Sequence, residues 1–133
     1  MDAKEYDFKA RAECLKQFGY LPGTIGAITN LFKPTQGMIY EYYYKVAPRL
    51  NVNGQKELGK LRTEADVLAM ELERLRYISA DLMHKIDRYL LNEEPIQRDD
   101  QELAAFKSDT AQLRKRVLEL NARIKAFVNS LNA

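Results

Sequence analysis

Histidine and cysteine, the residues that most often supply nucleophiles, bases and metal ligands, occur once each in this chain, as His84 and Cys14. Cys14 has no histidine near it in the sequence and lies on the apolar side of an expected helix, which favours a packed thiol over a nucleophile. A zinc site would need several carboxylates at ligand spacing, and acidic pairs such as Glu93-Glu94 fall instead in a polar loop. We therefore expect no enzyme activity, no cofactor and no small-molecule substrate.

The most unusual local feature is a run of four tyrosines within five consecutive positions, from Tyr40 to Tyr44. Consecutive helical positions point around the helix axis, so the four rings cannot all be buried together. Tyrosine has an apolar ring and a polar hydroxyl, which suits it to interfaces. We interpret Tyr40, Tyr43 and Tyr44 as a candidate interface with another protein. The alternative, in which Tyr43 joins Ile39 and Val46 in a core, stays open.

Polar and basic residues beside the tyrosines are candidates for contacts to DNA. Two short helices, expected over 25–32 and 36–47 and joined by a tight turn, have the layout of a helix-turn-helix, whose second helix enters the major groove. In that layout Gln36 could read an adenine edge, while nearby cations hold phosphates. The alternative is two ordinary helices of a small bundle. The candidate DNA contacts are Lys33, Thr35, Gln36, Lys45 and Arg49.

Residues 15–46 also carry a resemblance to a known family. The residues concerned are Leu15-Lys16-Gln17-Phe18-Gly19, Ile25, Ile28-Thr29-Asn30-Leu31, Ile39, Tyr43 and Lys45-Val46. Their order resembles the N-terminal helix-turn-helix of the FlhC-type transcriptional regulators, which activate flagellar and conjugation genes. The match needs extra residues around Lys33-Pro34-Thr35, and the family's cysteine-rich zinc region has no counterpart here. The resemblance implies a helix-turn-helix in the first part of the chain and carries over no activator role.

In the second part of the chain, mostly apolar residues recur at steps that alternate between three and four positions, so that they form two columns along one side of a helix. This alternation is the a/d seam of a coiled coil, which a strand cannot produce. A polar segment over 92–100, with Pro95 inside it, interrupts the seam because proline ends a helix. Two seams of similar length joined by a short loop predict an antiparallel coiled-coil hairpin over 56–133. The first seam comprises Leu58, Leu61, Ala65, Leu68, Leu72, Leu75, Ser79, Leu82, Ile86 and Tyr89, and the second Leu103, Phe106, Thr110, Leu113, Val117, Leu120, Ile124, Phe127 and Leu131.

The part before this hairpin, residues 1–50, is expected to form a small helical head. Gly19 is suited to ending a first helix, and Thr35, after Pro34, is a candidate N-cap for the third. Residues 51–55 are expected to be a turn or linker. The sequence thus predicts an all-α protein in which a three-helix head precedes the hairpin. The expected head helices span about 3–18, 25–32 and 36–47.

Composition and charge indicate the class of protein and its expected cellular location. The 133 residues are 46% apolar and 30% charged, as in globular proteins, and the net charge is only +2. Residues 1–62 carry ten Lys/Arg and six Asp/Glu, and residues 63–133 carry eleven and thirteen. A basic head on an acidic stalk is compatible with phosphate binding. With a single cysteine, no signal peptide and no membrane-length apolar run, we expect a soluble intracellular protein, cytoplasmic or nuclear, of cellular or viral origin.

The hairpin's apolar face is wider than its seams, so it needs a further helix to cover it. That helix could come from the head, from a second copy in a four-helix bundle, which we favour, or from another protein. Two functional hypotheses follow. The first is a non-enzymatic assembly or adaptor subunit that acts through coiled-coil and head contacts; the alternative is a helix-turn-helix DNA-binding protein dimerised by its hairpin. The residues that widen the face are Tyr77, Met83, Leu91, Leu118 and Val128.

Overall fold

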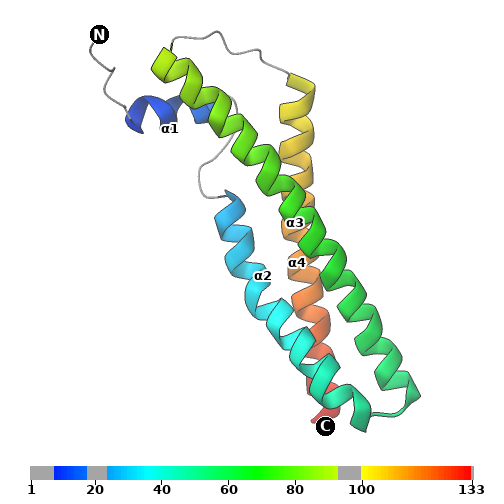
Figure 1. Ribbon diagram of the computed structural model, residues 1–133. Helices are drawn as coiled ribbons and strands as arrows, with labels where there is room; N and C mark the ends of the chain where they lie inside the picture. Colours follow the sequence, from blue (N-terminus) through cyan, green and yellow to red (C-terminus); the bar gives the residue numbers. More distant parts are fainter. Residues whose placement is uncertain (1–7, 18–23, 93–99, 133) are drawn as a thin grey trace.

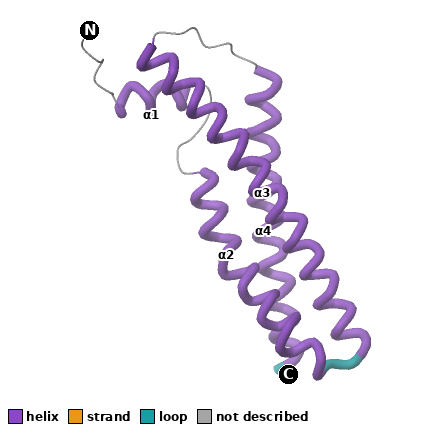
Figure 2. Tube along the Cα trace, in the orientation of Figure 1, coloured by secondary structure: helices purple, strands orange, loops and turns teal. Residues whose placement is uncertain are grey.

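The computed structural model describes residues 8–17, 24–92 and 100–132, and these residues are helical almost throughout (Figure 2). No strand occurs in the described part of the chain, so the all-α prediction is confirmed. A π-helical turn, Tyr42–Val46, and a 3-10 turn, Ala47–Arg49, follow the second helix. The helices are α1 (Phe8–Gln17), α2 (Thr24–Glu41), α3 (Val52–Asn92) and α4 (Asp100–Leu131).

The three longer helices lie side by side as an up-and-down bundle (Figure 1). α3 and α4 run in opposite directions, and α2 packs against both of them along the half of the bundle where α3 begins. α1 crosses the other end of α3, where Arg11 forms an ion pair of 2.9 Å with Asp87. The wide apolar face of the hairpin is therefore covered by α2 of the same chain.

The core of the bundle is built from the two heptad seams and one face of α2. A fully buried Leu or Ile is worth roughly 1.5–3 kcal/mol relative to an exposed one, so this shared stripe is the main source of stability. The seams end before the helices do, because Tyr89 and Leu131 are exposed. The buried seam residues are Leu58, Leu61, Ala65, Leu68, Leu72, Leu75, Ser79, Ile86, Phe106, Thr110, Leu113, Val117, Leu120 and Ile124, with Leu82 partly buried.

Some of the residues that widen the apolar face are partly buried, and others are exposed. Met83 and Val128 are partly buried and pack against the core. Tyr77, Leu91 and Leu118 remain exposed on the outside of the bundle. α2 thus covers much of the hairpin's apolar face and leaves scattered apolar side chains, which are normal on protein surfaces.

The largest departure from the sequence prediction is at Pro34, which lies inside α2 rather than between two helices. The prediction of separate helices over 25–32 and 36–47 is wrong, and the tight turn of a helix-turn-helix is absent. Proline in a helix interior costs about 3 kcal/mol, but continuing the helix keeps five residues on one buried stripe, which offsets that cost. The stripe comprises Ile25, Ile28, Phe32, Thr35 and Ile39.

The linker expected over 51–55 is also shorter than predicted, because α3 begins at Val52. The Asn51 side-chain oxygen accepts a hydrogen bond of 2.8 Å from the Gly54 amide, which is the geometry of a helix N-cap. The chain therefore turns back at once, and the first turns of α3 lie beside the end of α2. Most of the loop expected over 92–100 lies outside the described residues.

Candidate functional site

The π-helical turn after α2 gathers the tyrosines. Its hydrogen bond runs from the Ala47 amide to the Tyr42 carbonyl, five residues back, and such wide turns are frequent at functional sites. The rings of Tyr43 and Tyr44 meet edge to face with centroids 5.1 Å apart. The Tyr40 ring lies 6.5 Å from that of Tyr44. The three candidate interface tyrosines therefore form one group, and one of them, Tyr43, also packs against the core, as Tyr42 does.

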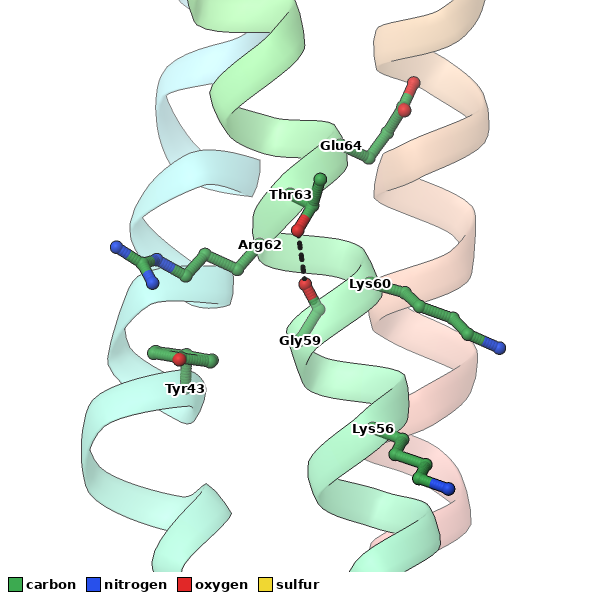
Figure 3. Close-up of a pocket in the computed structure, with 7 residues that line it drawn as sticks. All are labelled: Tyr43, Lys56, Gly59, Lys60, Arg62, Thr63 and Glu64. Carbon is green, nitrogen blue, oxygen red and sulfur yellow. Dashed lines mark hydrogen bonds between the residues drawn. The ribbon is translucent and has the colours of Figure 1, made fainter.

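Arg62, from the first part of α3, lies over this group of aromatic rings. Its guanidinium carbon is 4.7 Å from the ring centroid of Tyr43, which Figure 3 draws beside it. The same carbon is 5.6 Å from the ring centroid of Tyr44. A cation over an aromatic ring is attracted by the ring's negative face, by about 0.5–1 kcal/mol at an exposed site. The Nε of Arg62 is buried and has no hydrogen-bond partner in the described residues. The nearest carboxylate is that of Asp66, 3.9 Å from Nε.

A hydrogen bond ties the same group to α3. The Tyr40 hydroxyl donates to the Asp66 carboxylate, and this bond raises the pKa of Tyr40. Tyr40 and Asp66 therefore satisfy each other, whereas Tyr44 keeps 62% of its surface exposed. We call Tyr40, Tyr43, Tyr44, Arg62 and Asp66 the aromatic cluster.

A surface hollow of about 590 Å³ adjoins the aromatic cluster (Figure 3). Arg62 extends from α3 toward α2, whereas Lys56 and Lys60 extend toward the side of α4. Between them Gly59 has no side chain, and the Thr63 hydroxyl donates a hydrogen bond of 3.0 Å to its carbonyl oxygen. We call this the cationic hollow. Its lining consists of Tyr43, Lys56, Gly59, Lys60, Arg62, Thr63 and Glu64.

Arginines of α4 determine how much of the hollow's positive charge is neutralised. In an isolated helix Lys60 could pair with carboxylates three residues before it and four residues after it. In the bundle, arginines of α4 lie against both carboxylates, and neither Lys56 nor Lys60 has a carboxylate partner among the described residues. The hollow therefore keeps uncompensated positive charge. The two bridges between α3 and α4 are Arg116–Glu64, at 2.8 Å, and Arg123–Glu57, at 3.8 Å.

The candidate DNA contacts do not form one surface. Lys45 and Arg49 are exposed and lie at the same end as the tyrosines, but Lys33 is exposed near the middle of α2. Gln36 is partly buried. Thr35 is only 2% exposed, so its prediction as a DNA contact is wrong; it belongs to the face of α2 that packs on the hairpin.

Other residues singled out in the sequence add no chemistry to this end. His84 is exposed on α3, and the side chain of Cys14 in α1 lies outside what the structure describes. No group of three potential metal ligands occurs in the described ranges. Within those ranges, no helix combines the length and the apolar character needed to cross a membrane.

Comparisons of the chain with protein-family models, curated proteins and solved structures find no match. Function is therefore inferred from the geometry of the aromatic cluster and the cationic hollow. Sequence reasoning identified the three tyrosines but missed Arg62, Lys56 and Lys60. The available signal was that these cations lie within ten residues of a short turn, which brings them back beside the tyrosines.

Proposed function

We propose that this protein is a non-enzymatic assembly or adaptor subunit that binds a partner protein through the aromatic cluster. The observation that carries the proposal is the exposed ring of Tyr44 held beside Arg62. Tyrosine and arginine are enriched among the residues that contribute most to protein–protein binding. Contacts with Tyr43 and Arg62 restrict the Tyr44 ring before binding, which lowers the entropy lost on association.

The rest of the bundle acts in this proposal as a rigid support. The seam residues of α3 and α4 are already buried against each other and against α2. A partner helix would have to displace α2 to reach them, at the cost of re-exposing its apolar stripe. We therefore propose contact through the surface cluster in preference to association through the seam.

The experiment compares Tyr44→Ala with Tyr77→Ala, an equal change at another tyrosine. Tyr77 is 71% exposed on α3 and belongs to neither the aromatic cluster nor the cationic hollow. Each full-length variant is cross-linked in cells that express it, purified, and its bound proteins are quantified by mass spectrometry. We expect a defined partner to be lost with Tyr44→Ala and kept with Tyr77→Ala. A partner set unchanged by Tyr44→Ala contradicts the proposal.

DNA binding is the second candidate, and exposed cations near the tyrosines favour it. Lys45 and Arg49 lie in or just after the π-helical turn, next to the start of α3. Without the turn of a helix-turn-helix, such binding would rest on phosphate contacts and would weaken steeply with salt. A gel shift with random duplex DNA at low salt tests it. A shift that Lys45→Gln and Arg49→Gln abolish, with no protein partner found, would favour DNA over the adaptor proposal.

A further inference from the structure

We infer that the cationic hollow receives the carboxylates of an acidic segment of the partner protein, an inference that rests on the proposed adaptor function. Lys56 and Lys60 are four residues apart on α3, so their stems leave the same side of the helix roughly 5–6 Å apart. Carboxylates four residues apart on an acidic helix have the same spacing. The flexible four-carbon stem of each lysine lets its ammonium group follow such a ligand.

The charge of the surrounding surface supports an anionic partner. Residues 24–66 and 110–132, which form the half of the bundle around the hollow, carry eleven Lys/Arg and five Asp/Glu. The described residues of the other half, 8–17, 67–92 and 100–109, carry eight of each and are neutral on balance. Three of the five acidic residues near the hollow are already engaged by Arg116, Arg123 or Tyr40. An acidic segment would thus be attracted to this end more strongly than to the other.

The same observations favour a polypeptide over nucleic acid. The hollow has the volume of a site for a few side chains, whereas duplex DNA needs a long basic stripe. Glu41 is exposed at the end of α2 and Glu119 is exposed on α4, so carboxylates interrupt any such stripe. A short acidic segment can place its charges on Lys56 and Lys60 while avoiding both.

The test measures binding of a fluorescent deca-glutamate peptide to the full-length protein by anisotropy in about 0.1 M salt. Lys56→Gln combined with Lys60→Gln should weaken binding about tenfold, since each of the two exposed charge contacts is worth roughly threefold in Kd. The matched control, Lys16→Gln combined with Lys107→Gln, removes two exposed lysines of α1 and α4 in the other half of the bundle and changes the net charge equally. It should change Kd by less than about twofold, because charges beyond about 10 Å are largely screened at 0.1 M salt.

Four results would overturn the inference. Equal weakening in both double variants would mean that only net charge matters. No binding of the peptide to the unaltered protein would remove the site. A single- or double-stranded oligonucleotide of equal charge that binds more tightly, with the same loss on Lys56→Gln and Lys60→Gln, would assign the hollow to nucleic acid. If a partner depends on Tyr44 but not on the two lysines, the inference fails and the adaptor proposal stands.

Discussion

Pro34 offers a direct test of whether α2 is continuous. In a regular helix the amide of residue 34 would donate to the Asn30 carbonyl, but proline has no amide hydrogen and its ring crowds that carbonyl. Pro34 is exposed, so replacing it by alanine restores a hydrogen bond without removing buried contacts. We therefore expect Pro34→Ala to increase the free energy of unfolding.

The magnitude follows from two opposing terms. Alanine is favoured over proline by about 3 kcal/mol in a helix interior. Proline also restricts the unfolded chain, and losing that restriction costs roughly 0.4–1 kcal/mol. The net gain is about 2 kcal/mol, which for a chain of this length raises Tm by roughly 6–8 °C. Urea and thermal denaturation followed by far-UV circular dichroism measure both quantities.

Gly37→Ala is the matched control in the same helix. A Cβ added at Gly37 meets nothing within 4 Å, so this change should stabilise the protein by about 1 kcal/mol. If the chain instead turned at residues 33–35, Pro34 would precede or begin a helix, where proline is favourable. A neutral or destabilising Pro34→Ala beside a stabilising Gly37→Ala would then refute the continuous helix.

Two further predictions concern the core and the aromatic cluster. Leu75 is 0% exposed, so Leu75→Ala should lower the free energy of unfolding, measured in urea, by about 2–5 kcal/mol. The control is Met70→Ala, at a side chain that is 74% exposed, which should lower it by less than about 0.5 kcal/mol. Equal losses in the two variants would contradict the buried seam. Tyr40→Phe should cost about 1 kcal/mol at neutral pH, because it removes the hydrogen bond to Asp66. Since that bond raises the pKa of Tyr40 in the folded state, its stabilisation is fully present below the unfolded pKa of about 10 and is lost as pH rises through the folded value. Between pH 9 and 12 the unaltered protein should therefore lose stability more steeply than Tyr40→Phe, and parallel pH profiles would rule this out.

The buried faces of α3 and α4 were predictable because helical burial repeats locally. One side of a helix returns every 3.6 residues, so apolar columns such as Leu61–Leu68–Leu75 report directly on which side is covered. What they do not report is the covering element. The same wide face fits a second copy, another protein or α2, and only the packing of the whole chain selects α2.

Local rules failed at Pro34 for a related reason. Proline is a strong signal for the end of a helix when only neighbours in sequence are considered. Here Ile28, Phe32, Thr35 and Ile39 must all face the hairpin, and a turn at Pro34 would break their common stripe. The free energy gained from several buried side chains exceeds the penalty of one proline, and that balance depends on contacts with residues far along the chain.

The charge of the candidate site, like the packing of α2, depends on contacts between residues that are far apart in the sequence. Divided along the sequence, the chain has a basic first part and an acidic second part, which suggests that the hairpin contributes nothing to anion binding. Charge adds in space, however, and the return of α4 brings Arg116 and Arg123 beside α3, where they engage the carboxylates that Lys60 would otherwise use. The positive potential of the hollow therefore arises from α3 and α4 together. A sequence reading could have anticipated it only by fixing the antiparallel register of α3 and α4 first.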